Sequence, residues 1–467
     1  MKLWDRFAPE LMTDLYELTM AASYLAEGMS AEATFSLYIR DYPAHRAYFV
    51  SAGLEHILEL VPKITFTDES IDYLASLGRF SPEFLDYLKG FRFTGTIRAI
   101  PEGRILFAQE PLIEVSGPII EAQILETLII NVLQLETLIA SKAARCVHAA
   151  RGRALIDFSM RRTHGIEASV KVARASYLAG FSGTSNLLAG KLYDIPVYGT
   201  MAHSYITSFE HELDSFLVYA KAFPESTVLL IDTYDTLCGA EKALQVARLM
   251  QEKGKTLLGV RLDSGDMVEL SKRVKRMFQE AGFPNLSIIV SGSLDEFRLQ
   301  EMLDAGAQID VFAIGTRMGV SADAPYFDIA YKLVEYAGRP VLKLSSGKKT
   351  WVGKKQIYRH YDENGMMRED VLALLSEPQT GAVPMMETVM ENGRPVRPIE
   401  SLETIRNRFK KEWETLPPAY QDIATPGQYP VKISPSLRAL EQRISEQATH
   451  EEIEQACPKL RKAEEQK

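Results

Sequence analysis

Short runs of β-branched and apolar residues recur between residues 150 and 345, each followed by a polar or glycine-containing turn and then a helical pattern. The six strongest runs are ALIDFS, VYGTMA, VLLIDTYD, LLGVRLDS, SIIVSGS and VFAIGTR. Continuous apolar strands separated by helices are typical of a parallel sheet that is buried on both faces. The series therefore predicts either an open doubly wound sheet or a closed (β/α) barrel.

The residues at the ends of these runs favour the barrel, because a barrel gathers the carboxyl ends of many strands into one site. Nearly every run ends in side chains suited to chemistry: Ser159 to Arg161, His203, Asp232 and Asp235, Asp263 and Asp266, Ser291 and Gly292, and Thr316 and Arg317. We therefore predict an α/β fold whose active site lies at that end of the barrel.

The rest of the chain differs in pattern from the barrel region. Residues 1–145 mix helix and strand, with ATFSLYIR and FTGTIRAI as strands, and are predicted to form an N-terminal α/β domain before the barrel at 146–345. Residues 346–467 begin with SSGKKTWVGKKQIYR, which resembles a basic hairpin with a glycine turn. A charged surface helix is expected from 434 onward, and we expect this C-terminal segment to pack back on the other domains.

Composition excludes some classes of protein. The 467-residue chain has a formal net charge of −9, which argues against a dedicated nucleic-acid binder, so an anionic ligand needs a local basic pocket. Cys146, Cys238 and Cys457 are far apart and show no metal-ligand spacing, so we expect neither a disulfide nor a structural zinc.

Two parts of the sequence bear on the location of the protein. The start of the chain has no signal-peptide pattern, so we expect a cytoplasmic protein. The most apolar stretch, residues 119–140, is interrupted by Glu121, Glu126 and Glu136 at helical spacing. We therefore expect a buried amphipathic helix there and no membrane partner.

His203 follows the run VYGTMA, with Gly199 and Thr200 just before it. A carboxylate from a later strand, such as Asp232 or Asp263, could hold one ring nitrogen. That bond would fix the tautomer and leave the other nitrogen free to act as nucleophile or base. A histidine at a strand end is structural about as often as it is catalytic. The catalytic interpretation of His203 therefore depends on these carboxylates.

The segment GVRLDSGDM places Arg261, Asp263 and Asp266 at the end of one strand. An arginine beside two carboxylates suits a site that holds an anion while the carboxylates bind ribose hydroxyls or Mg²⁺. Ser264 and Asp266 could equally be N-caps of the following helix, whereas Arg261 caps nothing.

Two late strands end in small residues that could cradle phosphate. SIIVSGS ends at Gly292, and VFAIGTR ends at Gly315 and Thr316, each before a predicted helix. Backbone N–H groups at such turns bind anions, and this is the usual phosphate position of barrel enzymes. SSGKKT resembles the end of a P-loop, but no glycine stands five residues before Gly347, so we reject that interpretation.

The segment FSMRRTHG brings Arg161 and Arg162 to a strand end, directly after Phe158. Arginine pairs at a surface are usually only solvated, but this pair lies on the predicted catalytic face. Together with the other cations, carboxylates, cradles and histidine, it predicts a pocket for a polyphosphorylated sugar, with Mg²⁺ as cofactor.

Eight segments resemble, in order, the nicotinate phosphoribosyltransferase family: TDLYELTM, FSMRRTHG, FSGTSN, YGTMAHS, LLIDTYDT, VRLDSGD, FAIGTRMG and WVGKKQIYR. This resemblance implies a type II phosphoribosyltransferase fold, an irregular α/β barrel with a sandwich-like domain from the outer parts of the chain. It also implies a homodimer with shared active sites. The implied reaction joins nicotinate and phosphoribosyl pyrophosphate into nicotinate mononucleotide and pyrophosphate, coupled to ATP as co-substrate, in the Preiss-Handler salvage of NAD biosynthesis.

The resemblance also implies roles for individual residues. His203 resembles the residue that ATP transiently phosphorylates. Tyr16 resembles a ring that stacks on nicotinate from the neighbouring subunit, and Phe158 resembles its partner on the other face. The remaining implied positions are substrate contacts, namely Thr200 and Arg261 for nicotinate and Thr316 for phosphoribosyl pyrophosphate.

Charge gives an expected mechanism for this transfer. Loss of pyrophosphate leaves an oxocarbenium-like sugar. Mg²⁺ and Arg161 would neutralise the leaving group, while Asp263 and Asp232 would hold the ribose and favour its cationic form.

Three alternatives remain. The amide-using nicotinamide phosphoribosyltransferase carries an acidic residue where FSGTSN has Ser185, so Ser185 favours nicotinate. The decarboxylating quinolinate enzyme needs no ATP. A non-catalytic regulatory barrel would lack a catalytic group, whereas His203, Asp232 and Arg261 are all present.

Overall fold

The structure, a computed structural model, describes residues 8–344 and 350–451. The chain divides into two compact units. Unit 1 comprises Met1–Thr137, Tyr326–Asp422 and Pro426–Lys467, and unit 2 comprises Leu138–Pro325 and Ile423–Thr425. The outer parts of the sequence therefore fold together, with the boundaries of the middle unit near 137 and 325.

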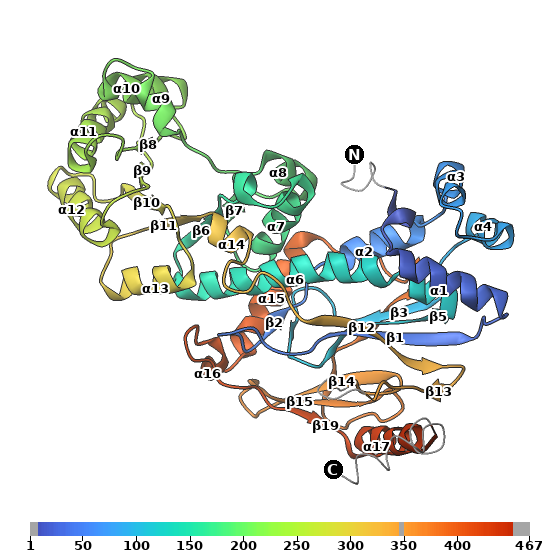
Figure 1. Ribbon diagram of the computed structural model, residues 1–467. Coiled ribbons are helices and arrows are strands. Elements are labelled where there is room, and N and C mark those ends of the chain that lie inside the picture. Colours follow the sequence, from blue (N-terminus) through green and yellow to red (C-terminus); the bar gives the residue numbers. More distant parts are fainter. Residues whose placement is uncertain (1–7, 345–349, 452–467) are drawn as a thin grey trace, which may run out of the picture. The chain divides into compact units, whose positions relative to one another are not determined.

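Unit 1 contains a seven-stranded antiparallel sheet (Figure 1). Its strand order is β13 (Arg339–Pro340), β12 (Ile329–Tyr336), β1 (Glu32–Ile39), β5 (Pro111–Pro118), β3 (Thr96–Ala99), β17 (Glu387–Glu391) and β18 (Arg394–Pro395). The central strand β1 has the alternating sequence EATFSLYI, yet all its residues after Glu32 are buried. Both faces of the sheet are therefore covered.

A second, four-stranded sheet covers one face of the first. Its order is β16 (Val383–Pro384), β14 (Lys355–Tyr361), β15 (Met367–Leu374) and β19 (Val431–Ile433). Glu114 on β5 accepts a hydrogen bond from Ser36 on β1 at 2.7 Å and lies 3.1 Å from the ammonium of Lys355 on β14. Burial lowers the pKa of Lys355, and Glu114 opposes that shift. This buried pair joins the two sheets into a sandwich.

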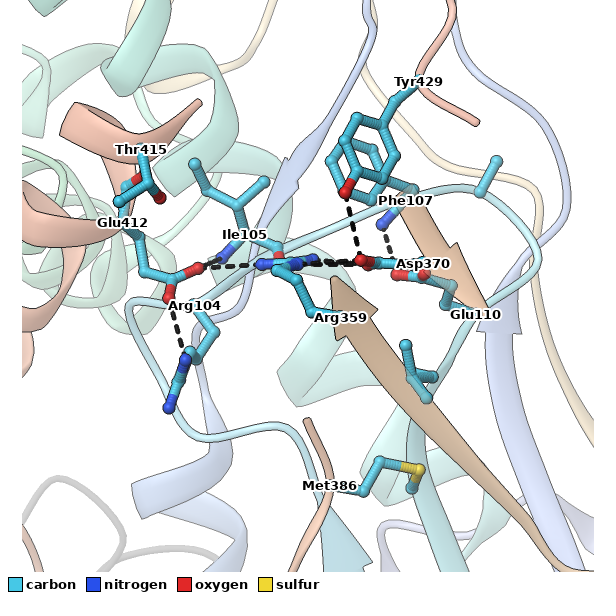
Figure 2. Close-up of polar contacts among 12 residues, drawn as sticks. Arg104, Ile105, Phe107, Glu110, Arg359, Asp370, Met386, Glu412, Thr415 and Tyr429 are labelled. Atoms are coloured by element: carbon cyan, nitrogen blue, oxygen red, sulfur yellow. Dashed lines mark hydrogen bonds and ion pairs between the residues drawn. The ribbon is translucent and has the colours of Figure 1, made fainter. Parts of the chain in front are cut away.

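Arg359 of β14 is the centre of a buried polar cluster (Figure 2). Its guanidinium pairs with Asp370 of β15 at 2.7 Å and with Glu412 of α15 (Leu402–Thr415) at 2.9 Å. It also donates to the carbonyl of Ile105 on β4 (Ile105–Leu106), which pairs with β2 (Phe49–Val50). The cluster therefore fastens the C-terminal segment to the N-terminal part of the chain.

The helices of unit 1 lie around these sheets. They are α1 (Leu15–Ala26), α2 (Leu54–Leu60), α3 (Asp68–Ser76), α4 (Pro82–Lys89), α5 (Ile119–Ile124), α15, α16 (Pro418–Gln421) and α17 (Pro435–Thr449), with 3₁₀ turns η1 (Pro9–Leu11) and η2 (Val61–Lys63). Helix α6 (Glu126–Ala149) crosses from unit 1 into unit 2. Residues 119–149 could span a membrane by length and composition, but 67% of their most apolar window is buried in the protein. The predicted buried helix is therefore present, as α5 and α6.

Unit 2 is built on a six-stranded parallel sheet. Its order is β7 (Gly183–Thr184), β6 (Ala154–Asp157), β11 (Val311–Ile314), β10 (Ser287–Ser291), β9 (Gly259–Leu262) and β8 (Val228–Leu230). The helices of this unit are α7 (Ile166–Leu178), α8 (Leu187–Tyr193), α9 (His203–Thr207), α10 (Glu212–Ala222), α11 (Thr236–Glu252), α12 (Met267–Glu280), α13 (Glu296–Asp304) and α14 (Thr316–Gly319), with the 3₁₀ turn η3 (Met160–Arg162) (Figure 1). The carboxyl ends of all six strands share one edge, which positions the site.

Five of the six predicted runs form strands, but VYGTMA does not. Val197 makes one isolated parallel bridge to Thr184 of β7, and the following residues are irregular up to α9. Pro196 has no N–H to donate, and Gly199 brings no side chain to pack, so a longer ladder is not supported there. The two-residue strand β7 was missed because it is too short to show a period.

The C-terminal segment also differs from the predicted hairpin. Residues 345–349 lie outside the described residues, and 350–354 form no strand. Instead β14 turns into β15 over Asp362–Met366, where Asp362 accepts hydrogen bonds from the backbone N–H groups of Asn364 and Met366. The Asn-Gly pair of this turn supplies the positive φ of 78° at Gly365. The charged helix expected from residue 434 is α17, capped by Ser434.

Candidate active site

A cleft of about 330 Å³ opens at the carboxyl ends of β6, β7 and β9 in unit 2. Seven of the predicted site residues line it: Phe158, Arg161, Ser185, Thr200, His203, Arg261 and Asp263. Met160, Gly199, Met201 and Ala202 complete the lining. The structure therefore brings together residues that are more than a hundred positions apart in the sequence.

Arg261 is the best-held cation of this cleft. It follows two buried residues of β9, and its side chain is only 11% exposed. The guanidinium donates to the hydroxyls of Ser291 at 3.0 Å and Thr200 at 2.9 Å and to the carbonyl of Met201 at 3.0 Å, and it lies 3.4 Å from Asp263. A guanidinium fixed by four groups is preorganised to bind an anion.

Phe158 lies against this cation. It is the first residue after β6, and its N–H donates to the carbonyl of Ile314 at 2.8 Å, so the strand ladder fixes its backbone. The centre of the Arg261 guanidinium lies 5.8 Å from the centroid of its ring. The cleft thus offers an aromatic face beside a fixed positive charge.

Two carboxylates end neighbouring strands. Burial opposes ionisation of Asp263, but the Ser291 hydroxyl and the charge of Arg261 outweigh it and lower the pKa of Asp263. Asp232, just after β8, is buried, and its Oδ2 accepts from the backbone N–H of Asp263 at 2.8 Å and the hydroxyl of Ser264 at 2.7 Å. Among the described residues, no group donates to its Oδ1. That oxygen is therefore available to a ligand hydroxyl or a cation.

His203 lines the cleft as the first residue of α9, and it does not follow a strand directly. Its Nδ1 lies 3.1 Å from the hydroxyl of Thr233. The predicted carboxylate partner is therefore wrong within the described residues: a neutral hydroxyl from the loop after β8 orients the ring.

The predicted carboxylates Asp235 and Asp266 are helix caps. Asp235 accepts from two backbone N–H groups at the start of α11, and Asp266 does the same for α12. In each residue only Oδ1 accepts these bonds, and neither residue lines the cleft. The capping alternative for Asp266 is therefore confirmed, Asp235 is also a cap, and a ligand role of either residue stays a prediction.

The two predicted phosphate cradles differ in geometry. Gly292 has φ of +97°, and a Cβ there would lie 2.6 Å from the carbonyl oxygen of Asp263, so only glycine fits. Helix α13 begins only at Glu296, so Gly292 is not at a helix N-terminus. Gly315 directly precedes α14, with Thr316 as its first residue. These residues follow β10 and β11, which lie between β9 and β6 in the sheet, and their phosphate role stays a prediction.

Sequence reasoning missed Asp157, the last residue of β6. Its carboxyl is fully buried and accepts from the N–H of Ser159 at 2.8 Å and the hydroxyl of Thr184 at 2.7 Å. Burial raises the pKa of Asp157, and these hydrogen bonds oppose the shift. Its position just before Phe158 is the only signal that the sequence carried.

Two further predictions concern groups outside this cleft lining. Tyr16 lies in unit 1, as the second residue of α1, and is 45% exposed. Partial burial and the charge of Glu126 raise the pKa of Tyr16. Within residues 8–344 and 350–451 there is no cluster of three or more histidine, cysteine, aspartate or glutamate side chains that could hold a metal ion. A preformed all-protein metal cage is therefore not part of the described chain.

Comparisons with known proteins place this geometry in a family. Models of the nicotinate phosphoribosyltransferase N-terminal domain, the family itself and its C-terminal domain match residues 11–134, 153–365 and 378–441. The nicotinate phosphoribosyltransferase pncB2 of Mycobacterium tuberculosis is 44% identical over 91% of this chain and 91% of its own length. The nicotinate phosphoribosyltransferase of Bacillus subtilis is 37% identical over 79% of this chain and 76% of its own.

A solved structure agrees with these matches. The crystal structure of human nicotinic acid phosphoribosyltransferase superposes with a TM-score of 0.84 at 28% identity, covering 93% of this chain and all of the human one. The predicted type II phosphoribosyltransferase fold is thereby confirmed, and the C-terminal match extends the relationship past the last motif found in the sequence. The chain therefore belongs to the nicotinate phosphoribosyltransferase family.

Proposed function

We propose that the cleft binds nicotinate beside phosphoribosyl pyrophosphate and joins them into nicotinate mononucleotide and pyrophosphate. The observation that carries this proposal is Arg261, fixed by Thr200, Ser291 and Asp263 against the ring of Phe158. An aromatic ring that bears a carboxylate needs both a stacking face and a fixed cation, and this pair supplies them.

Ser185 supports nicotinate over its amide. It lines the same cleft directly after β7, and its hydroxyl brings no charge near a substrate carboxylate. An acidic side chain at this position would repel nicotinate and accept a hydrogen bond from nicotinamide. The proposed substrate is therefore the acid.

The carboxylates are proposed to serve the sugar. Departure of pyrophosphate gives a loose, oxocarbenium-like transition state, which nearby negative charge stabilises. Asp263, whose pKa is lowered, carries that charge at neutral pH, and the free Oδ1 of Asp232 can accept a ribose hydroxyl. Arg161 lies in the same cleft and is placed to neutralise the leaving group.

Mg²⁺ fits this arrangement as a shared ion. The free Oδ1 of Asp232 and the ionised Asp263 are oxygen ligands of the kind that Mg²⁺ takes, and the remaining positions would fall to substrate phosphates. When bound, the ion would neutralise the pyrophosphate as it leaves. The two protein carboxylates would hold it next to the sugar.

We also propose that ATP phosphorylates His203. The ring lines the cleft, the Thr233 hydroxyl holds Nδ1, and no described residue bonds to Nε2. A phosphate there adds charge beside the substrate residues and can order them. His203→Ala is expected to lose both ATP hydrolysis and ATP stimulation of synthesis, and full stimulation in that variant would contradict the assignment.

The site is further proposed to be shared between two copies of the chain. Met160, the first residue of η3, lines the cleft and is 40% exposed, and Tyr198, next to the cleft residue Gly199, is 46% exposed. Leu15 and Tyr16 of α1 are 43% and 45% exposed in unit 1. Apolar surface of this kind is typical of an interface. Mixing inactive Tyr16→Ala and His203→Ala proteins should restore part of the activity, and no recovery after verified subunit exchange would count against sharing.

Nicotinate binding tests the proposal directly. Calorimetric titration should show that Arg261→Ala weakens nicotinate binding by about 100-fold or more, because a charge-assisted pair is lost from a partly buried site. Arg298→Ala, which removes an exposed cation that pairs with Glu301, is the matched control and should bind normally. Equal affinity in wild type and Arg261→Ala would contradict the proposal.

A further inference from the structure

Asp157 is a buried carboxyl for which the proposed reaction gives no role. It has no exposed surface, and no arginine, lysine or histidine pairs with it among the described residues. Burying an acid without a cation is costly, and burial raises its pKa. A leucine or valine would suit an ordinary strand end in such a core.

Its contacts join the ends of two neighbouring strands. The ladder between β6 and β7 has only two pairs and ends at Asp157 and Thr184. Beyond it, one carboxyl oxygen of Asp157 accepts from the Ser159 N–H at 2.8 Å and the other accepts from the Thr184 hydroxyl at 2.7 Å. The backbone carbonyl of Asp157 accepts from the Ser185 N–H at 2.8 Å.

The two hydrogen bonds of the Asp157 carboxyl act on two different residues of the base site, and we call these two bonds the brace. Phe158 lies between Asp157 and Ser159, so the first bond fixes the turn that presents the ring. Ser185 directly follows Thr184, so the second bond fixes the residue proposed to select the acid. Both Phe158 and Ser185 line the cleft.

We propose that Asp157 is a positioning residue for the pyridine base, acting through Thr184 to hold Phe158 and Ser185 in register. This inference rests on the proposed function. Thr184 completes the brace, because its oxygen also accepts from the N–H of Asn186, which caps α8. The brace thus fixes the ends of β6 and β7, while Arg261 lies on β9 and Asp263 directly follows β9.

Two substitutions break the brace without removing a lining residue. Asp157→Asn keeps an acceptor for Ser159 but turns an amide N–H toward Thr184, so the Thr184 hydroxyl can no longer donate in this pair. Thr184→Val keeps the side-chain volume and removes the hydroxyl. Thr184→Ser retains the hydroxyl and is the conservative rescue.

The expected result is a selective loss of base recognition. Asp157→Asn and Thr184→Val should each raise KM and Kd for nicotinate about ten-fold and shift the nicotinate to nicotinamide ratio of kcat/KM toward the amide, because small misplacements of binding groups are costly. KM for phosphoribosyl pyrophosphate should change less than about two-fold in both variants, and Thr184→Ser should stay close to wild type.

Asp310→Asn is the matched control. Asp310 precedes β11 at the opposite end of the same sheet and accepts from the N–H of Ile288 at 2.8 Å. Asp310→Asn should leave the KM values for nicotinate and phosphoribosyl pyrophosphate unchanged.

Unchanged kinetics in Asp157→Asn and Thr184→Val would overturn the positioning role. An equal rise of both KM values with a lowered melting temperature would also overturn it. If Asp157→Asn does not fold, the Thr184→Val and Thr184→Ser pair carries the comparison. Absence of any mononucleotide with wild type would instead overturn the proposed function.

Discussion

Replacing Arg359 with leucine tests how the C-terminal segment is held to the rest of unit 1 (Figure 2). The guanidinium contacts both oxygens of Asp370 at 2.7–3.2 Å, and it donates to Glu412 and to the carbonyl of Ile105, each at 2.9 Å. Burial opposes its charge, but Asp370 and Glu412 outweigh that effect and raise the pKa of Arg359. A leucine therefore leaves two buried carboxylates without their shared cation.

The expected loss of stability depends on the partners that Asp370 and Glu412 retain in Arg359→Leu. Asp370 keeps the hydroxyl of Tyr429 at 3.1 Å, and Glu412 keeps Arg104 at 2.8 Å. Burial and the charge of Asp370 raise the pKa of Glu110 well above its usual range, so its neutral carboxyl adds no further charge. Breaking a buried ion pair by removing one partner costs about 3–5 kcal/mol. We expect the free energy of unfolding to fall by that amount, a large part of the about 5–15 kcal/mol of an ordinary domain.

Urea unfolding followed by circular dichroism measures this loss. Arg368→Leu is the matched control, because Arg368 is 56% exposed and pairs with Glu369 at 3.4 Å; it should cost less than about 1 kcal/mol. Combining Arg359→Leu with Asp370→Asn should cost less than the sum of the two single changes. Equal losses in Arg359→Leu and Arg368→Leu, or strict additivity with Asp370→Asn, would refute the reasoning.

Three further predictions concern the site and its surroundings. Ser185→Asp should shift the ratio of kcat/KM for nicotinate over nicotinamide toward the amide about ten-fold, since two like charges in a partly dry pocket cost about 1–3 kcal/mol; equal losses for both bases would make Ser185 a structural residue. Gly292→Ala should raise KM for phosphoribosyl pyrophosphate or unfold the loop, because its Cβ would meet the Asp263 carbonyl at 2.6 Å; wild-type kinetics would contradict this. Burial raises the pKa of Glu17 from 4.5 to about 7, so the stability from its protonated form is present below 4.5 and lost as pH rises through about 7. Glu17→Gln should therefore raise the melting temperature at about pH 8 and not at about pH 4, and an equal change at both values would contradict the shift.

The sequence predicted the parallel sheet and most of the cleft for a physical reason. Apolar, β-branched runs such as SIIVSGS are typical of strands buried on both faces, and parallel strands bring their carboxyl ends to one edge. Phe158 and Arg261, at the ends of two such strands, were therefore expected to lie near each other, whereas His203 reaches the cleft as the first residue of α9. The positions of strands with weaker patterns, such as β7, could not be predicted in this way.

The roles of individual polar residues were harder to predict. Asp263 and Asp266 stand three positions apart in one motif, yet the first contacts Arg261 and the second caps α12. Which role each takes depends on where the helix begins, and the start of a helix is the feature that sequence patterns predict least exactly. His203 is held by Thr233 of another loop, and Asp157 is held by Thr184 of another strand, so neither spacing nor composition could indicate these partners.

The formation of product from a panel of bases tests the central claim most directly. Purified protein is mixed with phosphoribosyl pyrophosphate and Mg²⁺, with or without ATP, and with nicotinate, nicotinamide or quinolinate in separate reactions, and the mononucleotide is quantified by mass spectrometry. We expect nicotinate mononucleotide and pyrophosphate from nicotinate, more of both with ATP, and at most traces of mononucleotide from the other two bases. Mononucleotide formed only from nicotinamide or quinolinate, or none from nicotinate, would contradict the proposed function.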